Sequence, residues 1–421
     1  MTLNDVSVQS LRQFFPALSR ELNGQPIAFF DGPAGTQVPQ RVIDAIGRYL
    51  VDCNANHDGL FKTSIDSDQM LAEAHQACAD LLGATDSETI SFGANMTSLT
   101  FALSRSISQN WSPGDEIVLS RLEHDANFTP WVLAARDRGV EVKTIDVDPS
   151  DCTLRLEQYR EKITPRTKLV AVGCASNAVG TINPVEQICK WASEVGALSF
   201  LDAVHFAPHA LMDVQKWNCD FLVCSAYKFF GPHVGIMYGK REHLESLQPY
   251  KLRTAPDSIP GRWMTGTQNH ECIAGTLEAV RYLASLGNPH PNAQSTEPGS
   301  IELRDQLCTA MSSIREYEAS LLNQLLDGLD QIPNIKVWGI TDREQLQHRL
   351  PTLSITHQKL SPKEVAQSLA DVGIFVWHGN YYALPLTEAL GVEPEGMVRI
   401  GLCHYNTQGE IVRLLKHLAS L

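Results

Sequence analysis

The sequence predicts an α/β fold with a mostly parallel sheet covered by helices on both faces, followed by a smaller α+β domain. Continuous apolar strand patterns alternate with helical patterns up to about residue 230. The segment 287–300, rich in proline, glycine and polar residues, interrupts the pattern, and a long helical pattern with shorter strand patterns follows it. Buried parallel strands are nearly continuous apolar runs because helices cover both faces of their sheet.

Each element follows from local periodicity. Leu71, Ala74, Cys78 and Leu81 recur at helical spacing, which predicts a helix over 68–82. Further helices are expected over 41–52, 99–107, 129–138, 154–163 and 184–195. Strands are expected over 89–92, 116–120, 141–147, 168–175, 198–203 and 220–227. After the loop, the pattern predicts a helix over 301–330 and strands in IKVWGI, TLSITH, IFVWHG and MVRIGL.

These patterns divide the chain into domains. We predict a large domain over 20–285, a linker over 286–300 and a small domain over 301–421, which the N-terminal segment 1–19 joins.

Composition narrows the function classes. The 421 residues are 43% hydrophobic and 19% charged, which is typical of a packed enzyme and not of a disordered chain. The net charge of −14 argues against binding to nucleic acid or to an anionic membrane surface. No signal peptide or membrane span is expected. The ten cysteines form no CxxC pair, so we expect reduced thiols, no metal site and a cytoplasmic protein.

Polar residues follow the predicted strands at the edge where ligands of such sheets bind. They are Asn95, His124, Asn177, Asp202 and Lys228. A lone aspartate or lysine at a strand end is often a cap or a solvated residue. Asp202 and Lys228 at the ends of successive strands, however, match the needs of pyridoxal phosphate. A lysine amine forms a Schiff base with its aldehyde, and a carboxylate keeps its ring nitrogen protonated.

The same cofactor needs hydrogen-bond donors to its phosphate and a flat group over its ring. The turn GANMTS, residues 93–98, follows a strand and opens a helix, so its backbone N–H groups can bind an anion. Ser225, three residues before Lys228, adds a hydroxyl group, and His124 offers a flat imidazole.

These motifs together resemble a known family. FDGPAG, GANMTSL, LEHDANFTPW, ASNAVGTINP, LDAVH, SAYKFFGPHVGIMYG, GTQN and MVRIGL occur in this order over residues 29–402. The chain resembles the class V aminotransferase-like proteins of fold-type I, and among them the cysteine desulfurase and selenocysteine lyase group. The resemblance implies a pyridoxal-phosphate-dependent transferase fold whose seven-stranded sheet lies between helices.

The resemblance also implies roles for single residues. Lys228 would form the Schiff base, Asp202 would pair with the pyridine nitrogen, and His124 would stack on the ring and act as acid or base. Asn177 would lie near the phenolic oxygen and the substrate, and Arg399 would bind the carboxylate of a small amino-acid substrate.

Further implied roles concern the phosphate. Ala94 and Asn95, mostly through their backbone, and Ser225 would hold it within one chain. Thr267 would reach the phosphate of a neighbouring subunit, which implies a homodimer with shared active sites.

Three positions depart from the family pattern. His205 stands where the family usually has glutamine, and Tyr227 where it has histidine, so both keep a hydrogen-bonding group toward the cofactor. Tyr382, in FVWHGNYYALPL, stands where desulfurases carry a mobile cysteine that accepts sulfur. Because a phenol cannot form a persulfide, the expected reaction is cleavage of a Cα–H or Cβ–S bond, with β-elimination as its outcome.

Other readings stay open. One alternative is transamination, epimerisation or β-decarboxylation with carbon–carbon bond formation. A second is a desulfurase that passes sulfur to an external acceptor, and a third is a binding protein without catalytic activity. Trp377, Tyr381 and Tyr382 make the substrate loop aromatic, which either suits a larger substrate or only packs the small domain.

Overall fold

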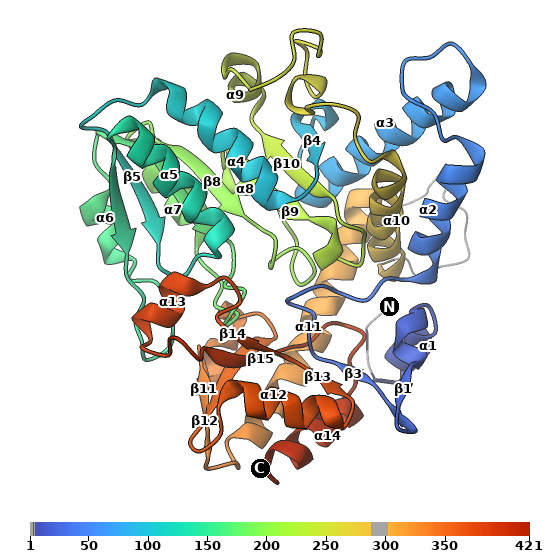
Figure 1. Cartoon of the computed structure of the whole chain (residues 1–421), viewed down its shortest axis with the longest axis vertical. Helices are drawn as coiled ribbons and strands as arrows, with labels where there is room; N and C mark the ends of the chain where they lie inside the picture. Colours follow the sequence, from blue (N-terminus) through green and yellow to red (C-terminus); the bar gives the residue numbers. More distant parts are fainter. Residues whose placement is uncertain (1–2, 4, 288–301) are drawn as a thin grey trace.

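The computed structural model describes residues 3, 5–287 and 302–421. Figure 1 shows a chain built around two sheets, a large one in the upper part of the view and a small one below it. The domain boundaries stay a prediction, and the predicted linker 286–300 lies outside the described residues beyond position 287. No described helix combines the length and apolar character needed to cross a membrane.

The large sheet has seven strands in the order β4-β10-β9-β8-β7-β5-β6. Every neighbouring pair from β9 to β6 is parallel, and β10 is antiparallel to both β4 and β9, which confirms the expected fold class. The strands are β4 (Ile90–Gly93), β5 (Glu116–Ser120), β6 (Glu141–Ile145), β7 (Thr167–Gly173), β8 (Leu198–Asp202), β9 (Phe221–Ser225) and β10 (Gly235–Gly239).

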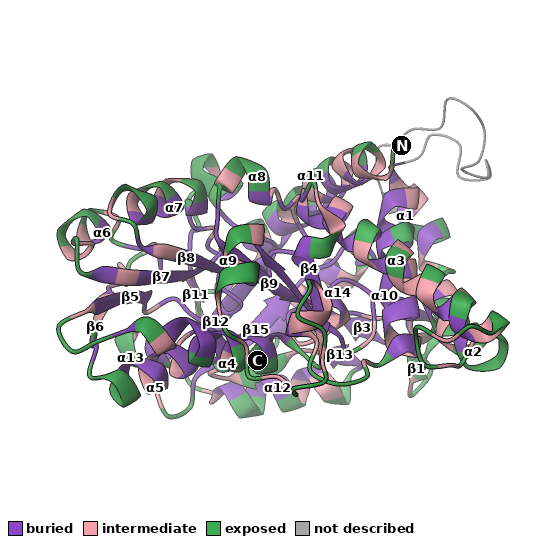
Figure 2. Ribbon diagram, turned by 90° about the horizontal axis from the view of Figure 1, so that it is seen from above, coloured by how far each residue is buried: buried purple, intermediate pink, exposed green. Residues whose placement is uncertain are grey.

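Helices cover both faces of this sheet because its strands present apolar side chains to both. On β5, Ile117 and Leu119 pack with α4 and α5, whereas Val118 belongs to the core on the opposite face. Figure 2 shows the buried strands between helices whose outer sides are exposed. The helices are α2 (Gln40–Asp52), α3 (Lys62–Leu82), α4 (Met96–Ile107), α5 (Thr129–Arg138), α6 (Glu157–Lys162), α7 (Val185–Glu194), α8 (Val214–Trp217), α9 (Arg241–Ser246) and α10 (His270–Leu286).

The small sheet is antiparallel, in the order β11-β12-β15-β14. Its strands are β11 (Ile335–Trp338), β12 (Thr352–His357), β14 (Trp377–Gly379) and β15 (Met397–Gly401). The helices of this part are α11 (Leu303–Leu329), α12 (Pro362–Asp371), α13 (Leu384–Ala389) and α14 (Gln408–Leu418). α11 packs against α3 and α10 as well as α14, so it connects the two sheets.

The N-terminal segment packs beside the small sheet and forms a separate two-stranded sheet with β13 (Ile374–Phe375). It contains α1 (Asp5–Arg12), β1 (Glu21–Leu22), β2 (Gln25–Pro26) and β3 (Ala28–Phe29). β3 pairs in parallel with β13, which splits the single strand expected for IFVWHG into β13 and β14. The backbone N–H groups of Ala28 and Phe30 donate to Gly373 and Phe375, and this long-range pairing has no local sequence signal.

The strand β10 and the helix α10 were not anticipated from the sequence. β10 is short and begins and ends with glycine, and α10 is buried on most of its surface, so neither shows a clear periodicity.

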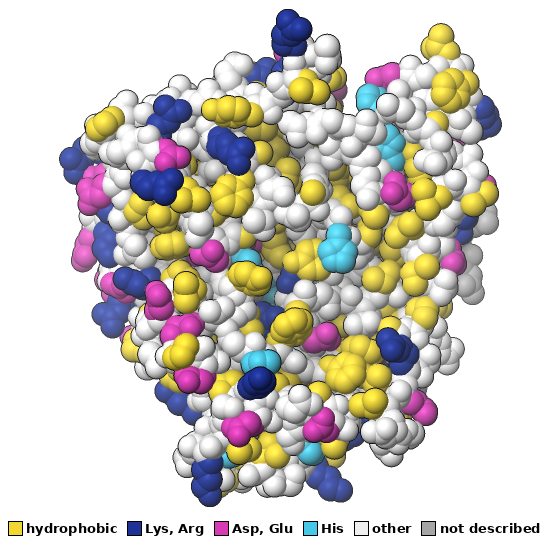
Figure 3. Space-filling view, in the orientation of Figure 1, with side chains coloured by type: hydrophobic (Ala, Val, Ile, Leu, Met, Phe, Trp, Pro, Cys, Tyr) yellow, Lys and Arg dark blue, Asp and Glu magenta, His cyan; other side chains and the backbone are white. Residues whose placement is uncertain are grey.

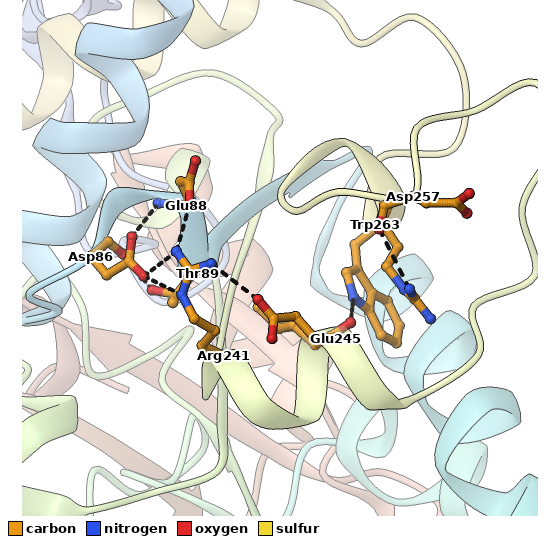
Figure 4. A network of polar contacts seen from close by, with 9 residues as sticks. Asp86, Glu88, Thr89, Arg241, Glu245, Asp257 and Trp263 are labelled. Atoms are coloured by element: carbon orange, nitrogen blue, oxygen red, sulfur yellow. Dashed lines mark hydrogen bonds and ion pairs between the residues drawn. The ribbon is translucent and has the colours of Figure 1, made fainter.

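A polar network fixes the segment between β10 and α10 (Figure 4). Arg241 at the start of α9 pairs with Asp86, Glu88 and Glu245, and Trp263 Nε1 donates to the Leu244 carbonyl at 2.9 Å.

One buried arginine binds main-chain carbonyls of both sheet regions. The Arg349 side chain is 1% exposed, and Nη2 donates to the carbonyls of Val179 at 2.9 Å and Thr352 at 2.8 Å. Nη1 donates to the Ile340 carbonyl. Burial lowers the pKa of this guanidinium to about 10. The charge is therefore solvated by carbonyl groups in place of water.

We predict that Arg349→Met lowers the free energy of unfolding by about 2–4 kcal/mol, because buried carbonyls lose their donors. Urea unfolding followed by circular dichroism measures the change. Arg343→Met is the matched control: Arg343 is partly exposed and pairs with surface aspartates, so its loss costs less than about 1 kcal/mol. Equal effects of the two substitutions would contradict this role of Arg349.

Candidate active site

Side chains from several strand ends line one cavity at the carboxyl edge of the large sheet. Of the residues predicted from the sequence, the structure brings eight together there: Asn95, His124, Asn177, Asp202, His205, Ser225, Tyr227 and Lys228. They follow β4, β5, β7, β8 and β9, which end at this edge. Figure 3 shows a hollow near the middle of this face, with histidine and cationic atoms inside it and hydrophobic side chains around it.

Lys228 is held in a buried turn directly after β9. Its side chain is 8% exposed, and Nζ donates to the Pro33 carbonyl in the FDGPAG segment. Burial, aided by the nearby Arg399 guanidinium, lowers the pKa of Lys228 to about 7. A large fraction of this amine is therefore uncharged, and hence nucleophilic, at neutral pH.

Asp202 ends β8, the strand next to β9. Its Oδ1 accepts a hydrogen bond of 2.8 Å from the Val204 N–H. Burial raises the pKa of Asp202 to about 6, whereas the hydrogen bond from the Val204 N–H and the charge of Lys228 both lower it. The carboxylate is thus mostly ionised at neutral pH and can pair with a cationic group in the cavity.

The start of α4 forms the next wall. Asn95 caps the helix by accepting from the Ser98 N–H at 2.9 Å, and Met96 N–H donates to Ser225 Oγ at 3.0 Å. Gly235 on β10 permits this arrangement, because a Cβ there would lie 2.5 Å from the Asn95 carbonyl carbon. A helix N-terminus with a serine hydroxyl beside it is suited to an anion.

Ala94 and Thr267 lie outside the Lys228 cavity of their own chain. Both are exposed, and they line a separate pocket. The structure therefore does not bring Thr267 to the Lys228 of the same chain.

His124 is fixed as a neutral imidazole. Its Nδ1 accepts from the Ala126 N–H at 3.0 Å, so the proton of the neutral ring is on Nε2. Burial lowers the pKa of His124 to about 3, and Lys228 and Arg399 act in the same direction. The Tyr382 ring lies 5.5 Å from the imidazole at an interplanar angle of 33°.

Asn177 connects the cavity to the small sheet. Its Nδ2 donates to the Tyr381 carbonyl at 2.9 Å, and its own carbonyl accepts from Arg399 Nη1 at 3.0 Å. Arg399 is 4% exposed on β15, with its guanidinium carbon 4.5 Å from the centre of the Tyr381 ring. Among the described residues no carboxylate is within ion-pair distance of Arg399, so this guanidinium can bind an anionic ligand.

Comparisons with known proteins show the family of the chain. Residues 28–298 and 301–414 match the sequence profile of the family described as Aminotransferase class-V. The chain belongs to this family. Enzymes of the class V family depend on pyridoxal phosphate.

Three similar proteins represent the relatives. A cysteine desulfurase of Pectobacterium carotovorum is 30% identical, with 98% of this chain and 97% of the relative covered. A cysteine desulfurase of Synechococcus elongatus is 31% identical over 97% of this chain, which spans 62% of that relative. The apo structure of a cysteine desulfurase from Thermococcus onnurineus has a TM-score of 0.86 and 26% identity, with 98% and 97% of the two chains covered.

The unpaired polar atoms of the cavity fit the cofactor of this class V enzyme. Asn177 Oδ1 and His205 Nε2 are buried without a hydrogen-bond partner in the described structure. Tyr227 stacks on His233 at 5.0 Å with an interplanar angle of 13°. Together with the Lys228 amine and the Asp202 carboxylate, these groups suit a polar aromatic ring that carries an aldehyde.

A wider cavity of about 800 Å³ adjoins the first and leads to solvent. It shares His124, Asn177 and Lys228 with the inner cavity and reaches Arg399. Sequence reasoning missed several lining residues: Pro33, Ala34, Thr97 and Phe101. The motifs FDGPAG and GANMTS contained three of them, but nothing local indicated which side chains face the cavity.

Neither cavity is lined by a thiol. All ten cysteines belong to the described part of the chain, and none lines either cavity. Cys403, which follows β15 by two residues, is 1% exposed, and burial raises the pKa of its thiol well above the usual value. Tyr382 occupies the loop that the sequence comparison singled out, and its side chain is 72% exposed.

We predict that trace labelling with acetic anhydride, a small reagent that reacts with the free amine, modifies Lys228 of the cofactor-free protein with a half-maximal rate near pH 7. Burial lowers the lysine pKa, so the reactive free amine appears as the pH rises through that value, and the rate then levels off. Exposed lysines as a class, with a pKa of about 10.4, react ever faster up to higher pH. Peptide mass spectrometry measures the labelling of Lys228 and of the exposed lysines separately. A pH profile of Lys228 that matches the profile of the exposed lysines would contradict the prediction.

Proposed function

We propose that this chain is a pyridoxal-phosphate enzyme that cleaves the Cβ–S bond of a small amino acid by β-elimination. The proximity of Lys228 and Asp202, which line one cavity from adjacent strands β9 and β8, carries this proposal. When bound, the cofactor supplies an aldehyde for the lysine amine and a ring that accepts the electrons of a substrate carbanion.

The residues of this chain would then share the work. Asp202 would pair with the ring nitrogen, and the turn Asn95–Met96 with Ser225 would receive the phosphate. Arg399 would orient the substrate carboxylate through its planar guanidinium. Lys228, with a pKa of about 7, suits the removal of the Cα proton near neutral pH.

The remaining groups complete the proposed site. His124 would stack on the ring and donate a hydrogen bond from Nε2–H to the departing group, and Asn177 would lie near the phenolic oxygen. His205 and Tyr227 would be further cofactor contacts. Ala94 would contribute its backbone to the phosphate site. Thr267, which lies outside its own Lys228 cavity, would serve the active site of a second subunit in a homodimer.

β-Elimination is favoured because it needs no enzyme thiol, and no cysteine lines either cavity. The second candidate is a cysteine desulfurase that gives sulfur directly to an external acceptor. The names of the curated relatives favour it.

We also propose a cytoplasmic location, because all ten cysteines are free and reducing compartments keep thiols in this state.

The first test concerns the cofactor. We expect the purified protein with added pyridoxal phosphate to be yellow and to carry the cofactor mass on Lys228 after borohydride reduction. Mass spectrometry of the peptide locates the adduct. Lys228→Ala should abolish the adduct, whereas Lys363→Ala, on the exposed surface of α12, should leave it unchanged. A protein that stays colourless with added cofactor would refute the proposal.

The second test separates the reaction outcomes. Incubation of the holoenzyme with L-cysteine or L-cystine should yield pyruvate and ammonium, the products of elimination. Alanine as the main product would instead indicate desulfuration and favour the second candidate. Enzymatic assays for pyruvate and for alanine, with Lys228→Ala as the blank, decide between elimination and desulfuration. Neither product from any sulfur amino acid would reject both sulfur reactions.

A further inference from the structure

The outer cavity has an aromatic rim formed by Phe101, Trp377 and Tyr382. Trp377 is 51% exposed and Tyr382 is 72% exposed, so neither packs the small-sheet region as a core residue. Tyr381, by contrast, is 9% exposed and packs on Arg399. Large aromatic surfaces left open beside a site are typical of a surface that binds an apolar partner.

The strand register places this rim beside Arg399, the proposed binding group for the substrate carboxylate. Trp377 on β14 stands directly opposite Arg399 on β15, so the two side chains extend from the same face of the small sheet. A substrate whose carboxylate is bound by Arg399 therefore has the indole beside it.

Tyr382 closes the rim from the other side, and its backbone is fixed. Tyr381 and Tyr382 have φ angles of 53° and 60°, a left-handed conformation that costs free energy for bulky residues. The Tyr382 carbonyl accepts from the Asp125 N–H at 2.6 Å, and its N–H donates to Asn380 Oδ1 at 3.1 Å. The phenol ring is thereby held above His124, next to the reacting centre.

The charges of the cavity exclude a second acidic group on the substrate. Lys228 and Arg399 are its only lysine and arginine among the described residues, and both have roles at Cα. The one lining carboxylate, Asp125, accepts from the Thr129 hydroxyl at 2.8 Å and would repel an anionic side chain.

We propose that the substrate is a neutral amino acid with a bulky apolar or aromatic group on its β-substituent, which the aromatic rim receives. This inference rests on the proposed function and specifies its substrate class as S-aryl or S-alkyl conjugates of cysteine. R–S–CH₂–CH(NH₃⁺)–COO⁻ and water give R–SH, pyruvate and ammonium. The sulfur keeps the electron pair of the broken C–S bond and takes a proton, Lys228 takes the Cα proton, and no oxidant is needed.

The test compares S-benzyl-L-cysteine, S-carboxymethyl-L-cysteine and L-cysteine with the holoenzyme. Dissociation constants come from the change in the visible absorbance of the bound cofactor, and kcat/KM comes from pyruvate formation. We expect S-benzyl-L-cysteine to bind about tenfold more tightly than the other two, because the rim removes an aromatic ring from water. Trp377→Ala should reduce this preference to about twofold, and Trp377→Phe should retain most of it.

Phe14→Ala is the matched control, since Phe14 is 57% exposed and does not line the cavity. It should leave the preference intact. Equal or tighter binding of L-cysteine or the carboxymethyl conjugate to a yellow, active holoenzyme would overturn the inference and leave the proposed function standing. A holoenzyme that binds S-benzyl-L-cysteine most tightly but releases no thiol from it would refute the C–S lyase proposal and support the rim as the recognition surface.

Discussion

The active-site geometry depends on the hydrogen bonds between the turn 176–183 and the segment 348–350, which leads into β12. Leu350 N–H donates to the Gly180 carbonyl and Ile182 N–H donates to the His348 carbonyl, both at 2.8 Å. Gly180 has a φ of 76°, and a Cβ there would lie 2.4 Å from the Thr352 carbonyl oxygen, so only glycine fits. This contact brings the two sheets together in the turn that follows β7 and contains Asn177.

Because Asn177 belongs to the same turn, the contact also sets the position of Arg399 relative to Lys228. The lysine stands on the large sheet and the arginine on the small one, and one asparagine binds the loop and the strand of the small-sheet region. A site assembled from two sheets needs such a rigid connection, since a displacement of about 1 Å impairs the alignment of reacting groups. Arg349 strengthens the same junction from within.

The cavities are less acidic than the molecule as a whole. The chain carries a net charge of −14, whereas Lys228 is balanced by Asp202 in the inner cavity, and Lys228 and Arg399 face Asp125 in the outer one. Because Arg399 has no carboxylate within ion-pair distance among the described residues, its charge stays available to a ligand that carries a carboxylate group. The neutral state of His124 follows from the same pair of cations together with burial.

Much of the site was predictable from the sequence, because residues at the ends of neighbouring parallel strands lie close together even when they are far apart in the chain. Asp202 ends a buried strand, and Asn177 and Lys228 each follow one. Parallel strands end at one edge of a sheet, so the meeting of these three residues was predictable. The Pro33 carbonyl that receives the Lys228 amine is 195 residues away, and no local pattern indicates that contact. The division of 374–379 between two sheets likewise depends on tertiary pairing with β3.

The fixed backbone at Tyr382 has a consequence for redesign. A sulfur-accepting side chain must travel between the substrate and an external acceptor, whereas Asp125 and Asn177 tie both carbonyls of the Tyr381–Tyr382 pair to the large-sheet region. Placing cysteine at 382 would therefore supply the nucleophile without the freedom to move. Conversion of this scaffold into a sulfur-relaying enzyme would require removing these two hydrogen bonds as well as exchanging the side chain.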